Sequence, residues 1–285
     1  WNENSDLSFS VNEESVPMGT AGSVKLLDNI LTDTFVVASG DSVLSSDLEV
    51  LVSAHKSSNA KVTMALWEVD DPTQFGIVGL SKMQNGDVDG SLKQGYISRF
   101  LEKPTVEQAF SNVINAGLYI IEPDVMSYVP KDTKFDFSKQ LFPHLLELGL
   151  PMYGVKLDGV WFDVGTPEEL IKAQNHLVKN HESLPFGLPK GEPIDDSSYL
   201  IDNSVSYSKL CRTVLSSNSI VGNDCELIDS IIMEGSTVGN NCSLIRTVVG
   251  ENVIVDDNCE LIDCVIGDEV HVTVGTKLTY ERVSK

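Results

Sequence analysis

The chain has 285 residues, of which 41% are hydrophobic and 22% charged, a composition typical of globular proteins with a sizeable core. Its net charge of −22, with no Lys/Arg cluster to offset it, argues against nucleic acid or an anionic membrane surface as a partner. No apolar run approaches the roughly 20 residues that cross a bilayer, so a cytoplasmic protein is expected.

The first elements in chain order alternate between helix and strand. Pro17–Gly22 is a Gly-rich segment that opens a helix, so its backbone amides are candidates to face a phosphate or a base. The short apolar run Asp33–Ser39 indicates a buried parallel strand that ends in Gly40-Asp41. Apolar residues then recur at helical spacing over Leu48–His55, and Ser46 is the expected N-cap.

The alternation continues through the middle of the chain. Lys61–Trp67 and Gly117–Ile121 have the pattern of buried strands, and Gly76–Leu80 with Gly95–Leu101 is typical of a hairpin. Ser138–Leu148 is expected to form a helix that ends at a glycine followed by a proline. This order predicts an α/β fold with a mostly parallel sheet covered by helices on both faces.

An internal repeat occupies the last third of the chain. Similar short segments start 17 residues apart, at Ser208, Cys225, Cys242, Cys259 and Thr276, and a fixed short period of this kind predicts a solenoid of β coils. The cysteines at equivalent positions should then form a buried ladder. Zinc or redox chemistry is disfavoured, because no CxxC pair and no histidine at zinc-ligand spacing accompanies them.

These patterns divide the chain into three parts. We predict an α/β domain over residues 1–183, a linker rich in Pro and Gly over residues 184–194, and a repeat domain over residues 195–285.

Three charged residues of the first part suit phosphate chemistry when they are taken together. Asp41 ends one predicted strand, and Asp163 ends another just before a helix that begins with Pro167 and Glu168. Lys103 lies in Glu-Lys-Pro after the hairpin. Carboxylates on Mg²⁺ with one lysine fit phosphoryl or nucleotidyl transfer, although each residue alone is more typical of a turn, a helix cap or a solvated surface charge.

Six motifs in order give the chain a family resemblance from about Asn4 to Glu182. The motifs are Gly-Thr-Ala-Gly from Gly19, Gly40-Asp41, Pro-x-x-Phe-Gly ending at Gly76, Glu-Lys-Pro from Glu102, Asn-Ala-Gly-x-Tyr from Asn115, and Trp-x-Asp-x-Gly-Thr from Trp161. With these motifs the chain resembles the sugar-1-phosphate nucleotidyltransferases, so the α/β domain would be Rossmann-like and the tail would be a left-handed parallel β-helix with three-sided coils.

The resemblance implies roles for individual residues. Asp41 and Asp163 would be the Mg²⁺ ligands, Lys103 would contact the sugar phosphate, and Glu102 would contact the sugar hydroxyls. The remaining residues would bind substrate: Gly76 and Asn115 line the sugar pocket with Tyr119 nearby, and Gly19 and Thr20 lie against the base and ribose.

The implied reaction joins a nucleoside triphosphate to a sugar 1-phosphate and releases pyrophosphate. The motifs do not decide which sugar or which base the reaction uses. Ser111–Tyr119 looks most like mannose-1-phosphate guanylyltransferases, whereas Phe135–Lys139 is equally at home in glucose-1-phosphate enzymes.

One part of the family pattern is absent. Members normally open with a strand and a Gly-rich loop bearing an arginine that wraps the triphosphate, and no such segment precedes Gly19. We therefore expect these residues to be part of a longer protein and to be inactive alone.

Two other functions are alternatives to the predicted nucleotidyltransferase activity. A non-catalytic regulatory or scaffold subunit could share this layout, but such relatives tend to lose the metal aspartates or the lysine, which are all retained here. An acyltransferase β-helix would need a catalytic histidine, and the sole candidate, His271, occupies a repeat position held by Ile220 and Ile254 in other coils. Because an open solenoid end needs a cap, we also expect a homo-oligomer formed through the β-helix.

Overall fold

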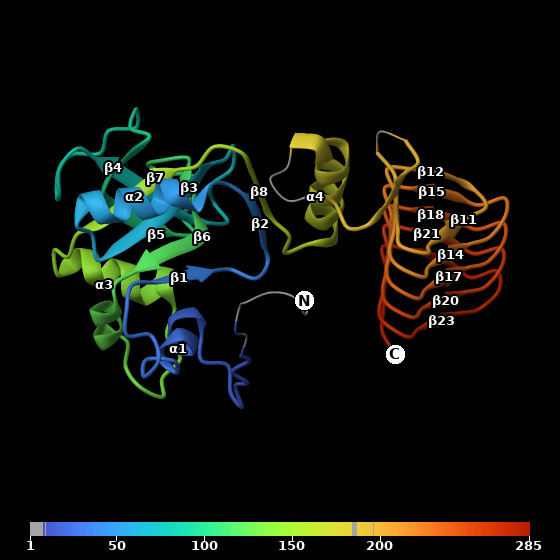
Figure 1. Ribbon diagram of the computed structural model, residues 1–285, viewed down its shortest axis with the longest axis horizontal. Coiled ribbons are helices and arrows are strands. Elements are labelled where there is room, and N and C mark those ends of the chain that lie inside the picture. Colours follow the sequence, from blue (N-terminus) through green and yellow to red (C-terminus); the bar gives the residue numbers. More distant parts are fainter. Residues whose placement is uncertain (1–7, 9, 184–186, 196) are drawn as a thin grey trace. The chain divides into compact units, whose positions relative to one another are not determined.

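The structure, a computed structural model, describes residues 8, 10–183, 187–195 and 197–285. These residues form two compact units, whose helices and strands are labelled in Figure 1. Unit 1 contains the residues up to Gly40 together with Ser46–Gly159, and unit 2 contains Asp41–Ser45 and Val160–Lys285. In the described part of the chain, none of the helices is long and apolar enough to cross a membrane.

Unit 1 is built on a six-stranded sheet with the order β1-β6-β3-β7-β5-β4. The expected α/β class is confirmed, but the pairing within the sheet is mixed: β3 and β7 are parallel and the other neighbours are antiparallel. Antiparallel pairing suits strands that a simple loop can join, as it does for β4 and β5. The strands are β1 (Phe35–Ala38), β3 (Val62–Glu68), β4 (Gly76–Ser81), β5 (Gln94–Glu102), β6 (Val113–Ile121) and β7 (Met152–Lys156).

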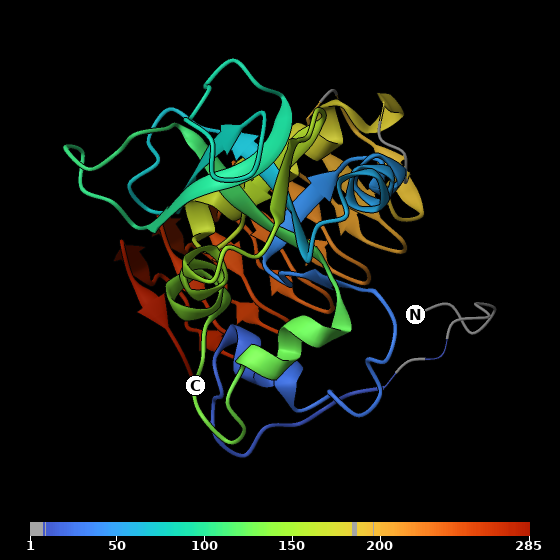
Figure 2. The same ribbon diagram turned by 90° about the vertical axis from the view of Figure 1, so that its left-hand side faces the viewer.

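Helices cover both faces of this sheet (Figure 2). On one face, α2 places His55 against Thr63 of β3. On the other, Phe142 of α3 belongs to the same buried cluster as Met64, which points away from Thr63 because side chains alternate along a strand. The helices of unit 1 are α1 (Thr20–Lys25), α2 (Leu48–Ser58), η1 (Pro123–Tyr128), the π-helical turn η2 (Phe137–Leu141) and α3 (Phe142–Glu147).

Two predicted helix boundaries need correction. The N-cap of α2 is Asp47 rather than Ser46, because the Asp47 carboxylate accepts the backbone N–H of Glu49 at 2.8 Å. The helix expected from Ser138 begins as the π-helical turn η2 and becomes α-helical only at Phe142.

His55 is buried in the layer between α2 and the sheet. Its Nδ1 lies 2.7 Å from the Thr63 hydroxyl, and its Nε2 lies 3.1 Å from Glu122, which also accepts a hydrogen bond from Thr34. This polar network holds α2 on the sheet.

Unit 2 begins with an antiparallel ribbon and a helix. The ribbon pairs β2 (Ser42–Ser45) with β8 (Val160–Asp163), and α4 (Pro167–Lys179) follows. Ile171 of α4 packs on Ile231 and Val248 of the repeat domain. This apolar contact explains why α4 belongs to the same compact unit as the repeats, whereas the predicted boundary placed it in the first domain.

The predicted linker contains a strand. Residues 184–186 lie outside the described residues, but β9 (Gly191–Pro193) pairs antiparallel with β10 (Tyr199–Ile201). The end of the linker therefore joins the first coil of the repeat domain.

The repeat domain is a β-helix with three sheets, one along each side of the coil stack (Figure 1). Equivalent residues of neighbouring coils pair in parallel, as in the series Ile220, Thr237, Ile254 and His271. The first sheet contains β9, β10, β13 (Val214–Leu215), β16 (Ile231–Ile232), β19 (Val248–Val249), β22 (Val265–Ile266) and β25 (Arg282–Val283). The second contains β11 (Val205–Ser206), β14 (Ile220–Val221), β17 (Thr237–Val238), β20 (Ile254–Val255) and β23 (His271–Val272), and the third contains β12 (Lys209–Cys211), β15 (Glu226–Ile228), β18 (Ser243–Ile245), β21 (Glu260–Ile262) and β24 (Lys277–Thr279).

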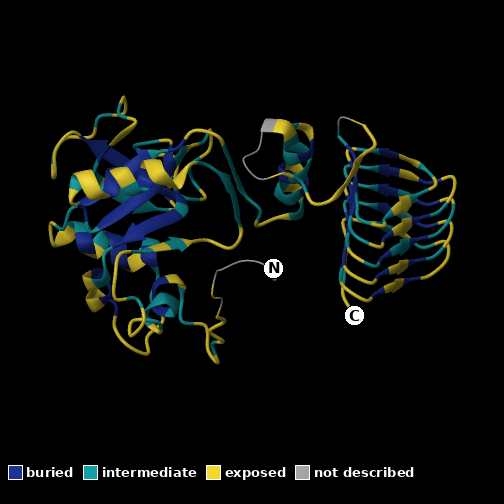
Figure 3. Cartoon of the chain, in the orientation of Figure 1, coloured by how far each residue is buried: buried dark blue, intermediate teal, exposed yellow. Residues whose placement is uncertain are grey.

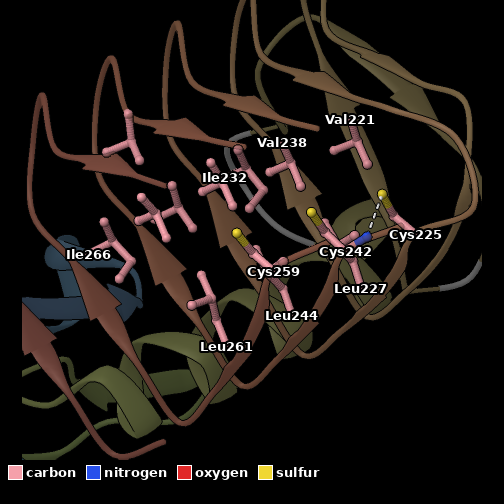
Figure 4. Packing of buried hydrophobic residues seen from close by; sticks show 14 of the residues in the cluster. Val221, Cys225, Leu227, Ile232, Val238, Cys242, Leu244, Cys259, Leu261 and Ile266 are labelled. Atoms are coloured by element: carbon pink, nitrogen blue, oxygen red, sulfur yellow. Dashed lines mark hydrogen bonds between the residues drawn. The ribbon is translucent and has the colours of Figure 1, made fainter. Parts of the chain in front are cut away.

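The predicted ladder of cysteines is confirmed inside the coils (Figure 4). Cys225, Cys242 and Cys259 are all buried, and the backbone N–H of Cys242 donates to the sulfur of Cys225 at 3.4 Å. A parallel ladder of leucines, including Leu227, Leu244 and Leu261, fills the interior beside them. In Figure 3, buried residues (dark blue) recur in every coil and dominate β3, β4 and β6 of the unit 1 sheet.

These thiols are expected to be unreactive in the folded protein. Burial raises the pKa of Cys242 to about 11, so its thiolate is scarce at neutral pH. Among the five cysteines, Cys211 is the only one that is not buried. Titration with a thiol reagent at pH 8 should modify one cysteine rapidly and the other four only after denaturant is added. Rapid modification of four or five thiols in the native state would contradict this packing.

Candidate active site

The β2–β8 ribbon of unit 2 brings the two predicted metal ligands together along the backbone. Ser42 is paired with Asp163, and the N–H of Val164 donates to the carbonyl of Asp41 at 2.9 Å. The two aspartates, 122 positions apart in the chain, are thus neighbours across one ribbon end. Carboxylate oxygens are the donors that Mg²⁺ prefers, so this pair fits the expected ion, with its remaining coordination left to water and phosphate.

Glu102 is the centre of a second group of residues, which lies in unit 1. Gly76 is its cross-strand partner, and a Cβ added at Gly76 would lie only 2.7 Å from the Glu102 carboxylate. Glycine at this position therefore leaves the space that the carboxylate occupies. Partial burial raises the pKa of Glu102, opposed by the positive charges of Lys103 and Lys139.

Asn115 and Tyr119 form a fixed hydrogen-bonded layer beside Glu102. The Asn115 amide donates to the Tyr119 hydroxyl at 2.7 Å and to the Ser138 hydroxyl at 3.2 Å, and its oxygen accepts the N–H of Gly117 at 2.9 Å. Burial raises the pKa of Tyr119 to about 12, so this hydroxyl stays neutral. These partners engage both hydrogens and the oxygen of the amide, which points to Asn115 as a support for the site.

Lys103 follows β5 directly and has an unusual backbone conformation. Its φ is 45°, in the left-handed region that few non-glycine residues adopt, and its N–H donates to the carbonyl of Phe75 at 2.9 Å. Fifteen other non-glycine residues among those described also have a positive φ, so this conformation marks a tight turn after β5 and does not by itself indicate a functional site. The side chain is exposed, and among the described residues no carboxylate lies within 4.0 Å of its ammonium.

Gly19 and Thr20 contact the segment just before η2. The N–H groups of Ala21 and Gly22 both donate to the carbonyl of Phe135 at 2.9 Å, so the amides expected to face a phosphate are already engaged. Gly19 has a φ of 74°, and a Cβ there would lie 2.8 Å from the same carbonyl oxygen. The Thr20 hydroxyl accepts the N–H of Phe137 at 3.0 Å.

Sequence reasoning did not select three residues that the structure places in this group: Asp136, Ser138 and Lys139. Asp136 accepts a hydrogen bond from Thr20 at 3.3 Å and, with Lys139, acts on the charge of Glu102. The segment Phe135–Lys139 stood out in the sequence as a motif, but its position against Glu102 depends on packing that the local pattern does not reveal.

Replacing Glu102 by Gln is expected to stabilise the substrate-free protein above the ordinary glutamate pKa of 4.5. Because the folded-state pKa is raised, the unfolded chain loses this proton first, so folding stability falls as pH rises through the interval above 4.5. The glutamine side chain does not ionise, so the variant does not lose this stability as pH rises. Thermal melting of both proteins from pH 3.5 to 8 should show equal stability at the acid end and a higher Tm for the variant at the neutral end. A lower Tm for the variant at pH 8 would contradict the burial of this carboxylate.

The predicted residues therefore form two groups, each within its own unit. Asp41 and Asp163 lie together in unit 2, while Glu102, Lys103, Gly76, Asn115 and Tyr119 lie together in unit 1. In the described residues, no group of three or more His, Cys, Asp and Glu side chains could hold a metal without further ligands. Any ion held by the aspartate pair would thus share its coordination with substrate or water.

Both the α/β part and the repeat part of the chain match known protein families. Residues 1–180 match the family described as nucleotidyl transferase, and residues 193–261 match the GlmU-like, C-terminal hexapeptide family. The chain is 35% identical over 153 residues to a UTP–glucose-1-phosphate uridylyltransferase of Synechocystis, which covers 52% of this chain and 37% of that protein.

Fungal and amoebal proteins are similarly related. A mannose-1-phosphate guanyltransferase of Eremothecium gossypii is 32% identical over 210 residues, covering 71% of this chain and 53% of its own length. A mannose-1-phosphate guanylyltransferase catalytic subunit beta of Dictyostelium discoideum is 31% identical over 180 residues, covering 62% of this chain and 46% of that protein. The chain thus spans about half the length, or less, of the curated relatives it matches. With six motifs in order and the matching domain over residues 1–180, the chain belongs to the sugar-1-phosphate nucleotidyltransferase family.

Proposed function

We propose that the protein transfers a nucleotidyl group from a nucleoside triphosphate to a sugar 1-phosphate, with mannose 1-phosphate or glucose 1-phosphate as the acceptor. The observation that carries this proposal is the Glu102 group, where a carboxylate suited to sugar hydroxyls adjoins a lysine suited to phosphate. Family membership supports the nucleotide-sugar chemistry, and the relatives' names support both of these sugars.

The reaction needs no general base. An oxygen of the sugar phosphate forms a bond to the α-phosphorus, the bond from that phosphorus to the bridging oxygen breaks, and pyrophosphate leaves with the electron pair. The attacking phosphate is already anionic at neutral pH. Catalysis then rests on holding the two substrates in line and on neutralising charge.

We assign the roles of the protein groups as follows. Glu102 accepts hydrogen bonds from sugar hydroxyls, Lys103 binds the sugar phosphate, and the Asn115–Tyr119 layer keeps Glu102 in place. Gly19 and Thr20 position the α1 segment beside the base and ribose. Members of this family generally use a divalent metal ion, and we propose Mg²⁺, held by Asp41 and Asp163, where it would neutralise phosphate charge.

A survey of substrates tests the proposal. The protein expressed from its full reading frame would be incubated with Mg²⁺, each of four triphosphates, and mannose, glucose or N-acetylglucosamine 1-phosphate. We expect pyrophosphate release for one main pair, and none from Asp163→Asn. No release from any pair would contradict the enzyme proposal and favour a non-catalytic subunit, which the retained Asp41, Lys103 and Asp163 argue against.

We also propose a homo-oligomer formed through the β-helix. Ile220 and Ile254 are exposed on one side of the coil stack. Exposed apolar side chains on one face favour association. Light scattering at micromolar concentration should give at least a dimer, and a monomer would contradict this proposal.

A further inference from the structure

The π-helical turn η2 presents one more cation to the Glu102 group. The N–H of Leu141 donates to the carbonyl of Asp136 at 3.1 Å, five residues earlier, and turns of this type are frequent at functional sites. Phe137 and Leu141 are buried and fix the turn, while Ser138 bonds to Asn115. Lys139, the next residue, is exposed.

Lys139 and Lys103 are alike in their surroundings. In the part of the chain that the structure describes, no carboxylate lies within 4.0 Å of either ammonium, although the chain carries 42 acidic residues. Strand pairing and one hydrogen bond bring the two lysines to the same group: Gly76 pairs with Glu102, and the next residue of β4 pairs with Ile114. Asn115, which follows Ile114, donates to Ser138, the residue before Lys139. Both positive charges act on Glu102, lowering its pKa against the effect of burial. The two lysines come from different elements, Lys103 from the end of β5 and Lys139 from η2.

The charges of this group favour a second cation at the place where a phosphate would bind. Glu102 and Asp136 contribute two negative charges near each other, and Lys103 alone would leave an excess of one negative charge. A phosphate monoester brings a further charge of about −1.5 to −2 at pH 7. With Lys139 the group is neutral before the phosphate arrives, and two ammonium groups can each donate to a different phosphate oxygen.

We propose that Lys139 is a second phosphate-binding residue, which holds the phosphate of the sugar 1-phosphate together with Lys103. This inference rests on the proposed function and adds a binding residue to it. The Lys139 ammonium would act on the phosphate through its positive charge. Arginine at this position should therefore retain much of the effect, whereas a neutral side chain of similar length should not.

The test compares phosphorylated and unphosphorylated ligands in the full-reading-frame protein. Lys139→Met keeps the length of the side chain and removes its charge. Calorimetric titration with mannose 1-phosphate and glucose 1-phosphate should show a Kd raised about 10-fold for the preferred one, as expected for loss of one charge-assisted hydrogen bond. The affinity for the parent sugar and the KM for the triphosphate should not change, and Lys139→Arg should recover most of the affinity.

Controls separate the possible failures. Lys131→Met removes another exposed lysine of the same unit and should leave the Kd unchanged, and circular dichroism at the titration temperature should show that every variant is folded. An unchanged Kd for Lys139→Met, or an equal loss for the phosphorylated and the free sugar, would overturn the role of Lys139 while the enzyme proposal stands. A wild-type protein that binds no sugar 1-phosphate and forms no product would overturn both.

Discussion

Replacing Lys103 by Met is expected to lower kcat/KM for nucleotide-sugar formation by about 10²–10³-fold, the usual cost of removing one preorganised charge partner. The ammonium has no carboxylate within 4.0 Å among the described residues, so its charge is available to the phosphate. The left-handed backbone at Lys103 fixes the direction in which the side chain leaves β5. Steady-state kinetics with the preferred substrate pair would measure the effect.

A matched lysine controls for the loss of charge. Lys82 is exposed in the loop after β4, at the opposite end of that strand from Gly76, and its ammonium lies 3.5 Å from the Asp89 carboxylate. Lys82→Met should keep wild-type kinetics within about twofold, because exposed ion pairs contribute little. Equal kinetics for Lys103→Met and Lys82→Met would remove Lys103 from the site.

Leu244→Ala should destabilise the β-helix by about 3 kcal/mol. Leu244 is fully buried in β18, between Leu227 and Leu261 of the neighbouring coils. Truncation of a buried leucine loses its burial and leaves a cavity, which typically costs 2–5 kcal/mol in total. Because each coil contacts only its neighbours, the damage should be greatest in the coils around residue 244.

Urea unfolding followed by hydrogen exchange would measure this effect and locate it. The control is Ser243→Ala, one residue earlier in the same strand, where the side chain points away from the core. It should change the free energy of unfolding by less than about 0.5 kcal/mol. Faster exchange confined to unit 1 in Leu244→Ala would contradict the assignment of this leucine to the coil interior.

The repeat domain could be predicted in detail because its order is local and periodic. The 17-residue step places Cys225, Cys242 and Cys259 in register, and the structure has them in one buried ladder. Sheet order in unit 1 could not be predicted in this way. The parallel pair β3–β7 joins segments 90 positions apart at Val62 and Met152, and no local pattern encodes that contact. The position of α4 could not be predicted either, because it depends on the packing of Ile171 against Ile231, 60 positions later in the chain.

The candidate site shows a similar division. Asp41 and Asp163 each follow or end a predicted strand, and the β2–β8 ribbon makes their backbones neighbours. Their role as metal ligands stays a prediction. The hydrogen bonds that engage Asn115 and the approach of Lys139 to Glu102 were beyond prediction, since both depend on where the π-helical turn η2 packs. Resemblance named Asn115 as a pocket residue, whereas its hydrogen bonds suggest a supporting role.

The most direct measurement of the central claim follows the phosphorus atoms of the triphosphate. The full-reading-frame protein would be supplied with the preferred sugar 1-phosphate and a triphosphate labelled separately at its α- and γ-phosphates, and the products separated by chromatography. Nucleotidyl transfer predicts the α label in the nucleotide-sugar and the γ label in pyrophosphate. Release of the γ label as inorganic phosphate, or a sugar product without the α label, would contradict the account.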